Sequence, residues 1–396
     1  MFPGTKWRRA SAFVMAAVVA AGGLTVWAEE TNEDVSADGV VNAESASNYI
    51  TDDFTSDMVE TNYTVVSQSL SSPYYEGEPV VIQPTEQFRA VNGTQIVPAV
   101  DGYVGAGGSS AAVQFDIHDS GVVTVEAPET ARYYVSMDYL DAGNSVLPLE
   151  LSMKVNGEYQ FYELRDLEFE AIWKDPAEKS YDRYGNQIVP MPDKVAKWQT
   201  KYVMDASHRH SRPLAIELQK GVNELEISMI EGTMLLGELH LTREPVIAEY
   251  AGSKEAEGQE LIVIQAEEMA ERNASSIRAA CEYDIDLTPY EVETKTLNTI
   301  DNASFSEAGQ KISYEFEVEK AGTYYLAMNF KQSEKADFPV FVNVEVDGEI
   351  PNSAFYNYGL GYAKGYQTKT FEDAEGNKLS LDLEPGTHTI SFMISA

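Results

Sequence analysis

One irregular stretch of the chain, residues 171–198, combines aromatic rings with planar polar side chains. Sugars present apolar C–H faces that lie against aromatic rings, and hydroxyl groups that pair with planar polar side chains. The residue types in this stretch therefore indicate a binding site for a glycan or an oligosaccharide. The candidate ligand-binding residues are Trp173, Asp175, Tyr181, Asp182, Arg183, Tyr184, Asn186 and Trp198.

A second aromatic stretch, residues 355–366, occupies the corresponding interval later in the chain. It adds three candidate ligand-binding residues, Tyr356, Tyr358 and Tyr362. The alternative interpretation of both stretches is packing, in which the rings hold each segment on its own domain or against a neighbouring one. Packing is the first explanation for any single ring, whereas a ligand platform would use several rings together.

The segment Gln265–Glu268 is the candidate metal site. A hard cation such as calcium takes carboxylate and carbonyl oxygens as ligands. Adjacent acidic residues are a weak signal in a chain with 64 of them, so the prediction is limited to Glu267 as a ligand of a structural calcium ion. A zinc site in Asp205–His210 is not expected, because zinc needs three or four ligands and this segment has two imidazoles.

Catalytic motifs are not evident in the chain. No Ser–His or Cys–His arrangement stands out, and the only cysteine, Cys281, has no base near it in the sequence. The glycine-rich run Gly102–Gly108 is not followed by Lys-Ser/Thr, so it predicts a turn rather than a phosphate-binding loop. Paired carboxylates are not excluded by residue type, but no α/β or barrel scaffold accompanies them. We therefore expect a non-catalytic protein.

The elements that must position these loops are β-strands, and they occur twice. The segments Ala131–Tyr139 and Leu151–Gly157 recur without a gap, 191 positions later, as Gly322–Phe330 and Val342–Gly348. Apolar and polar residues alternate along the first segment, which is typical of a half-buried strand. The sequence thus predicts one β unit that is used twice.

The predicted fold class is all-β, with two tandem β-sandwich modules at residues 73–244 and 257–396. The second module is expected to open with a strand at Leu261–Gln265, and the following residues 267–281 are either a short helix or a loop. The first module has a further strand at Leu235–Leu241 that the second module lacks. A missing strand would leave an unpaired edge, so we expect the natural polypeptide to continue.

The N-terminal part of the chain resembles an export signal followed by a linker. Residues 1–28 contain basic residues, a short apolar run and small residues at a cleavage position. Residues 29–72 are acidic and poor in large apolar side chains, which predicts a disordered linker. The formal net charge of −36 argues against binding to nucleic acid or anionic lipid. We expect an extracellular or cell-surface location.

Several short motifs resemble galactose-binding-like jelly rolls of the carbohydrate-binding module 6/35 type, namely Ile264–Glu267, Gly322–Tyr325, Val346–Gly348 and Pro385–Ile390. A narrower set is similar to the N-terminal halves of extracellular solute-binding proteins of Gram-positive carbohydrate ABC transporters, and it comprises Trp173–Asp175, Tyr184–Pro190, Trp198, Leu297–Thr299, Gly309–Gln310 and Tyr324. The resemblance covers roughly residues 74–396. It implies two tandem sandwiches ahead of a two-lobed solute-binding domain, which this sequence lacks.

Taken together, these features predict a secreted, non-catalytic carbohydrate-binding protein. Its narrower form would be the accessory N-terminal part of a sugar-binding transporter component. The alternative is a cell-surface spacer or a pair of protein-interaction modules without a sugar site. The expected partners are a glycan or oligosaccharide and, in the narrower and alternative forms, other cell-surface or transporter proteins.

Overall fold

The computed structural model describes residues 26–27, 40–41, 61–256, 260–333 and 336–395. The expected signal peptide and most of the expected linker lie outside the described residues. The chain divides into two compact units, Met1–Thr61 and Asn62–Ala396. In the first unit, β1 (Val26–Trp27) pairs antiparallel with β2 (Val40–Val41). No helix of the described residues is long and apolar enough to cross a membrane.

The second unit begins with a helix that the sequence did not indicate. Helix α2 (Tyr63–Ser69) is capped by Asn62, whose side chain accepts a hydrogen bond from the backbone N–H of Val65. Tyr63 and Val66 pack against the core of the first module. The expected linker, residues 29–72, therefore does not extend through residues 62–72, because Tyr63 and Val66 pack against the apolar core of the first module.

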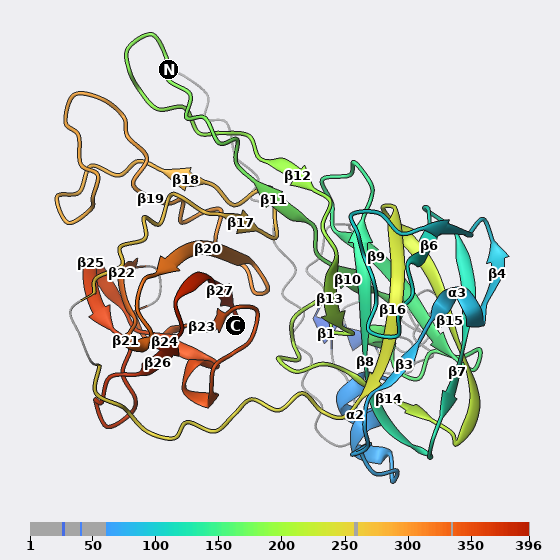
Figure 1. The fold of residues 1–396 in the computed structure, drawn as a ribbon. Helices are drawn as coiled ribbons and strands as arrows, with labels where there is room; N and C mark the ends of the chain where they lie inside the picture. Colours follow the sequence, from blue (N-terminus) through green and yellow to red (C-terminus); the bar gives the residue numbers. More distant parts are fainter. Residues whose placement is uncertain (1–25, 28–39, 42–60, 257–259, 334–335, 396) are drawn as a thin grey trace. The chain divides into compact units, whose positions relative to one another are not determined.

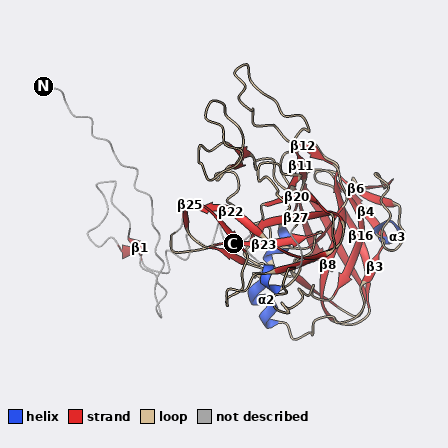
Figure 2. Ribbon diagram, turned by 60° about the vertical axis from the view of Figure 1, so that its left-hand side comes forward, coloured by secondary structure: helices blue, strands red, loops and turns tan. Residues whose placement is uncertain are grey.

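Two antiparallel sheets make up the first module, as the predicted fold class requires (Figures 1 and 2). One sheet has the order β10-β9-β15-β7-β4, from strands Leu167–Phe169, Leu149–Val155, Gly221–Glu231, Ser120–Ala127 and Phe88–Asn92. The other has the order β13-β8-β16-β6-β5, from Gln199–Tyr202, Ala131–Asp141, Met234–Thr242, Ala111–Phe115 and Gln95–Pro98. It also holds β14 (Ala215–Leu218) and β3 (Val80–Ile82), and the short elements α3 (Pro84–Gln87) and η1 (Tyr162–Arg165) complete the module.

The second module is built around one seven-stranded sheet with the order β12-β11-β17-β20-β27-β23-β24. Its first two strands, β11 (Ile172–Lys174) and β12 (Asp193–Val195), come from the stretch of residues 171–198, which is an insertion in the first module. The other strands are β17 (Glu271–Arg272), β20 (Lys311–Val318), β27 (Gly386–Ile394), β23 (Val340–Val346) and β24 (Tyr358–Leu360). Three two-stranded pairs complete the module. They are β21 (Gly322–Tyr325) with β26 (Ser380–Leu383), β22 (Ala327–Gln332) with β25 (Ala363–Thr370), and β18 (Ala279–Ala280) with β19 (Thr299–Ile300). The module also contains the short 3-10 helix η2 (Ser353–Phe355).

The internal repeat is visible in the strand register. Tyr133 of β8 lies opposite Ile216 of β14, and Tyr324 of β21 lies opposite Leu381 of β26. Tyr324 follows Tyr133 by 191 positions, and Leu381 follows Ile216 by 165 positions. The pairs that β15 forms with β7 and β9 are related to the pairs that β27 forms with β20 and β23 by the same two offsets. The second module therefore repeats the pairing of the first, residue by residue.

Burial differs from the predicted half-buried strand. In β8, Tyr133, Val135 and Met137 are completely buried in the core, as the alternation predicts. The other face is buried as well, because Tyr134 stacks on Tyr74 with ring centroids 5.9 Å apart. The first module thus encloses its central strand on both faces.

One expectation for the start of the second module is wrong, and an alternative that the sequence left open is decided. Residues 261–265 form no strand, because the described residues contain no counterpart of β16 with which they could pair. Residues 267–281 form no helix. They contain turns and the short strands β17 and β18, which agrees with the alternative of a loop.

Candidate functional site

Residues 172–195 of the insertion form an arm, whose strand β11 pairs with β17 of the second module. Trp173 of β11 lies opposite Lys194 of β12 on one side and opposite Arg272 of β17 on the other. The indole is only 6% exposed, and the Lys194 ammonium lies 5.8 Å from its ring centroid. In this structure Trp173 is a packing residue, which corresponds to the alternative interpretation of the aromatic stretch.

An ion pair fixes the base of this arm. Arg272 donates from Nη1 to Oδ2 of Asp175 over 2.8 Å, and its other terminal nitrogen donates to Oδ1. The Arg272 side chain is 1% exposed. A buried guanidinium needs a paired carboxylate, and a two-fold contact also sets the orientation of both groups. Asp175 therefore holds the arm and the second module together.

A tight turn at the tip of the arm presents two exposed tyrosines. Oδ1 of Asp182 accepts hydrogen bonds from the backbone N–H groups of Tyr184 and Asn186, at 2.8 and 2.9 Å. The side chain of Asn186 also donates to Asp182, and these bonds lower the pKa of the Asp182 carboxyl. Tyr181 is 58% exposed and Tyr184 is 67% exposed, with the Arg183 guanidinium 4.5 Å from the ring centroid of Tyr184.

The arm is also tied to a loop of the second module. The backbone N–H of Lys295 donates to Oδ1 of Asn186, and the N–H of Leu297 donates to Oε1 of Gln187. The N–H of Gln187 donates to the carbonyl of Lys295 over 2.8 Å. Asp182 and Asn186 thus build the turn and its attachment, whereas Tyr181, Arg183 and Tyr184 point their side chains to solvent.

A cavity of about 280 Å³ lies between this arm and the second module. Its polar lining includes Asp175, Lys179, Ser180, Gln187, Glu267 and Glu268. The ammonium of Lys179 pairs with Glu268 over 2.6 Å. Ser180 lies on the rim, directly before the exposed ring of Tyr181. The cavity therefore brings two predicted residues from different modules, Asp175 and Glu267, to one place.

Glu267 is the unusual member of this cavity. Its side chain is 9% exposed, and its Oε2 atom has no hydrogen-bond partner within the described part of the chain. Burial raises the pKa of the Glu267 carboxyl, and the negative charge of Glu268 adds to this effect. A buried polar atom without a partner is rare in proteins, so the burial of Oε2 is not offset by any bond within the described residues.

The cavity has only part of a calcium site. Calcium takes six to eight oxygen ligands. Here Asp175 is engaged by Arg272 and Glu268 by Lys179, and both partners are cationic. Glu267 fits as one ligand, but the described residues around it do not assemble a set of three. A structural calcium at Glu267 stays a prediction.

Trp198 lies away from this cavity, on the first module. Its ring stacks on Tyr103 with centroids 3.9 Å apart, and its Nε1 donates to the carbonyl of Val100 over 3.0 Å. It covers a small apolar cluster of Ala112, Leu140 and Leu235. The structure therefore separates Trp198 from Trp173.

The tyrosines of residues 355–366 are also separate from the cavity. The Tyr356 hydroxyl donates to the carbonyl of Ser211, and the Tyr358 ring stacks on Phe371 at 4.3 Å. Tyr362 is 45% exposed. Of these three residues, only Tyr362 presents a largely free ring.

The structure adds a polar network that sequence patterns did not reveal. Asp138, Glu238 and His240 lie on the outer face of β8 and β16, close enough to share an ion. The backbone N–H of Gly107 donates to both oxygens of Glu238, which is completely buried. A Cβ atom on Gly105 would lie 2.2 Å from the Glu238 carboxyl carbon, so the glycine-rich turn is shaped to this carboxylate.

Asp138 is fully bonded within this network. Its Oδ1 accepts from the Thr200 hydroxyl at 2.6 Å, and its Oδ2 accepts from the Tyr103 hydroxyl at 2.7 Å. Burial alone would raise the pKa of Asp138, but hydrogen bonds from His240, Thr200 and Tyr103 lower it. Because protein donors occupy its oxygens, the network serves to hold the turn rather than to present an open metal site.

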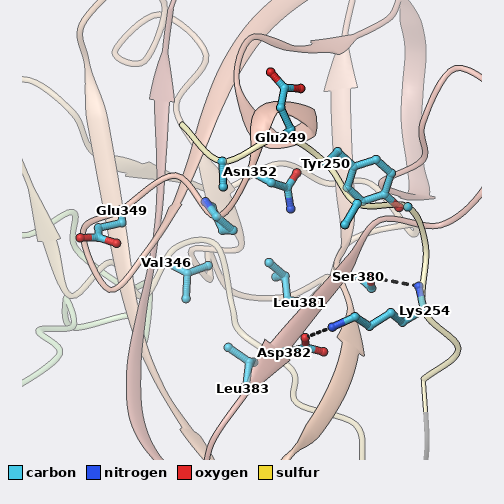
Figure 3. Close-up of a pocket in the computed structure, with 14 residues that line it drawn as sticks. Glu249, Tyr250, Lys254, Val346, Glu349, Asn352, Ser380, Leu381, Asp382 and Leu383 are labelled. Atoms are coloured by element: carbon cyan, nitrogen blue, oxygen red, sulfur yellow. Dashed lines mark hydrogen bonds and ion pairs between the residues drawn. The ribbon is translucent and has the colours of Figure 1, made fainter. Parts of the chain in front are cut away.

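A larger cavity of about 390 Å³ lies beside the segment that links the modules. Figure 3 shows Tyr250 on its wall and the apolar side chains of Val346, Leu381 and Leu383 inside it. Lys254 and Asp382 form an ion pair at its rim (Figure 3). Two of the charged groups that line this cavity are thus paired with each other. No sequence motif indicated this cavity.

Comparisons with solved structures match less than half of this chain. A family 35 carbohydrate-binding module from Clostridium thermocellum matches with 16% identity and a TM-score of 0.25, over 42% of this chain and 99% of that module. The carbohydrate-binding module of lichenase 5A from Cellvibrio mixtus, solved with cellotriose, matches with 14% identity and a TM-score of 0.23, over 42% of this chain and 98% of that one.

A larger enzyme is similar over a smaller share of its length. The GH26-CBM35 β-(1,4)-mannanase of Podospora anserina matches with 16% identity and a TM-score of 0.27, and the match spans 45% of this chain but 31% of the mannanase. No family model matches the sequence. No curated protein matches it either. These structural matches span 42–45% of this chain.

Proposed function

We propose that this protein binds a glycan without catalysis, at the cavity between the arm of residues 172–195 and the second module. The observation that carries the proposal is Glu267, whose buried Oε2 lacks a partner beside a cavity that residues 175–180, 187–188 and 190 of the arm help to line. A sugar hydroxyl would donate to Oε2, which removes the cost of an unsatisfied buried oxygen. The apolar face of a neighbouring sugar ring would lie on Tyr181 or Tyr184.

The test compares three substitutions in the complete chain. A glycan array identifies a ligand, and titration calorimetry measures its Kd. Losing a hydrogen bond to a charged group costs about 1.5–3 kcal/mol, so Glu267→Gln should weaken binding roughly ten- to a hundredfold. Tyr184→Ala should weaken it as well. Tyr362→Ala is the matched control, because its exposed ring lies outside the arm and outside the lining of the cavity.

Two outcomes would contradict the proposal. One is an array without any ligand, which would favour the alternative of spacer or protein-interaction modules. The other is a ligand whose Kd responds to Tyr362→Ala and not to Glu267→Gln or Tyr184→Ala. In both cases Asp175 and Asn186 would join the two modules without taking part in ligand binding.

A calcium ion is a second candidate ligand of Glu267. Any ligand that binds only the folded state stabilises it by mass action. A melting temperature that rises with calcium and falls with a chelator, in the protein but not in Glu267→Gln, would support the ion. An unchanged melting temperature would exclude it as a structural element.

The extracellular location and the role beside a carbohydrate transporter are narrower proposals. They are supported by the basic and apolar residues of the N-terminus and by the sequence motifs described above. Fractionation of the native cells with an antibody against residues 62–244 tests the location. Detection in the cytoplasm alone would contradict it.

A further inference from the structure

A side-chain amide closes one side of the first sandwich. Gln160 follows β9 in the chain and lies beside Glu217 of β14. Its Nε2 donates to the carbonyl of Glu217 over 2.6 Å, and the N–H of Glu217 donates to its Oε1 over 2.9 Å. One primary carboxamide, which has a donor and an acceptor side by side, thus satisfies both backbone polar groups of one strand residue.

The repeat places a different pair at this point of the second module. The offset of 191 positions puts Pro351 where the first module has Gln160, and the offset of 165 positions puts Asp382 where it has Glu217. The isolated bridge in the turn before Gln160 also recurs with the first offset. A proline side chain has no hydrogen-bond donor or acceptor. The second module therefore lacks the amide that closes the first.

The backbone of Asp382 keeps the outward direction of its equivalent. Asp382 lies opposite Thr323 of β21, as Glu217 lies opposite Arg132 of β8. The hydrogen-bonding direction alternates along an antiparallel pair, so with this common register the N–H and C=O of Asp382 point away from β21. Besides the strand pairing, the contacts of Asp382 within the described part of the chain are made by its carboxylate, which accepts from the Thr323 hydroxyl and pairs with Lys254.

The cavity of about 390 Å³ lies at this place, with both Pro351 and Asp382 in its lining. Figure 3 shows the apolar side chains of Val346, Leu381 and Leu383 in it. The two leucines are each 7% exposed, whereas their equivalents in β14 are completely buried. The volume is in the range of sites for small molecules. The cavity thus combines an apolar surface with one backbone donor and one backbone acceptor.

The segment of residues 248–254 restricts what can enter. The N–H of Lys254 donates to the hydroxyl of Ser380 at the start of β26, and the N–H of Tyr250 donates to the hydroxyl of Ser353 over 3.0 Å. An extended peptide paired along β26 would need the place that this segment holds. A compact molecule does not, so the cavity favours a small ligand.

Charge distinguishes a carboxamide from a carboxylate of the same shape. The carboxylates of Glu249, Glu349 and Asp382 line the cavity, with Lys254 as the basic residue among its lining residues. The Lys254 ammonium already pairs with Asp382. An anionic ligand would be repelled by the remaining carboxylates, whereas a neutral amide would not.

We propose that this cavity binds a small neutral molecule that carries a primary carboxamide on an apolar body. The carboxamide oxygen would accept from the N–H of Asp382, and its nitrogen would donate to the C=O of Asp382, as Gln160 does in the first module. The apolar body would lie on Val346, Leu381 and Leu383. This site is separate from the glycan cavity and does not depend on glycan binding there.

Benzamide is the probe, because it joins a primary carboxamide to an apolar ring. A ligand-observed NMR titration with the complete chain should show saturable binding. N-methylbenzamide and benzoate are the matched controls, since the first replaces the N–H beside the carbonyl oxygen by a methyl group and the second is anionic. Each should bind at least about tenfold more weakly, because one hydrogen bond is lost and its backbone partner stays unpaired.

Two variants at one position locate the molecule. Pro351→Gln supplies the amide of the first module, and it should weaken benzamide binding at least about tenfold by competing for the same backbone groups. Pro351→Ala removes the ring without adding an amide and should change the Kd by no more than about threefold. Val222→Gln, at a 71% exposed position of the first module, is the control for the added glutamine and should leave the Kd unchanged. A cooperative thermal melt checks that each variant is folded.

Three results would overturn the proposal. The first is the absence of saturable benzamide binding, and the second is an equal Kd for benzamide and its two controls. The third is a Kd that Glu267→Gln weakens and Pro351→Gln does not, which would place the molecule in the glycan cavity instead.

Discussion

The two modules share one pairing register but differ in how completely their central strand is enclosed. In the first module β8 has neighbours on both sides, and Tyr133, Val135 and Met137 are fully buried. In the second module the equivalent segment is divided into β21 and β22, and Tyr324 and Met328 remain half-buried. The comparison teaches that register is set by the repeated strands themselves, whereas burial depends on a further strand, β16, that lies outside the repeat.

The insertion partly compensates for this difference. It supplies β11 and β12 to the main sheet of the second module, and Asp175 neutralises the buried Arg272 there. A segment of the first module therefore completes the main sheet of the second, while the described residues add no further strand beside β21 and β22. Three experiments test how far the two modules differ.

The largest effect is expected for Asp175→Ala. This change leaves the Arg272 guanidinium buried and unpaired, which costs about 3–5 kcal/mol when a buried ion pair is broken. We expect that loss in the free energy of unfolding of the second module, measured by urea denaturation, with little change in the first. A loss below about 1 kcal/mol would show that the arm is not needed to complete the sheet.

The next effect compares equivalent core residues. Met137→Ala should cost about 2–5 kcal/mol, because it opens a cavity in a fully enclosed core. Met328→Ala should cost about 1 kcal/mol, because a half-buried side chain loses less apolar contact. Urea denaturation of the two variants checks the difference. Equal losses would mean that the second core is as tightly packed as the first.

The smallest effect concerns pH and a pair that differs between the repeats. In the second module Nδ1 of His388 lies 2.7 Å from Asp347, and this hydrogen bond raises the pKa of His388. The equivalent pair in the first module is Asn223 with Asn156, joined over 3.0 Å and uncharged. The raised pKa of His388 means that its stabilisation is complete below about pH 6.5 and is lost as the pH rises through the folded pKa.

Because half of the Asp347 side chain is exposed to solvent, the pH effect should be about 0.5–1 kcal/mol. Thermal melts between pH 5 and 9 should show it in the wild type. The double variant His388→Asn with Asp347→Asn reproduces the first module's pair and should abolish the dependence. A dependence that persists in the double variant would assign it to another group.

Much of the fold could be predicted from local patterns. Alternation in Ala131–Tyr139 and its recurrence at Gly322–Phe330 predicted the strands, and the gapless repeat anticipated the common register. Helix α2 escaped prediction because its stability comes from packing of Tyr63 and Val66 on a distant core rather than from helix propensity.

The candidate site was only partly predictable. Residue types placed Asp175, Tyr181, Tyr184 and Glu267 among the candidates, but no local signal showed that the first and last would line one cavity. Trp173 and Trp198 attracted attention by type, yet one pairs into a sheet and the other stacks on Tyr103. The role of Glu238 depends on Gly105 and Gly107, about 130 positions away, so it could not be recognised in the sequence.

The pairing of β11 with β17 also has a consequence for the order in which the strands fold during synthesis. Residues 172–195 are synthesised before any strand of the second module, and domains generally fold as units from the N-terminus during synthesis. By the time β17 emerges, β11 can already be held by β12, its partner in the arm. We therefore expect the second sheet to grow from this edge, with the arm as a template that lowers the free-energy cost of starting the sheet.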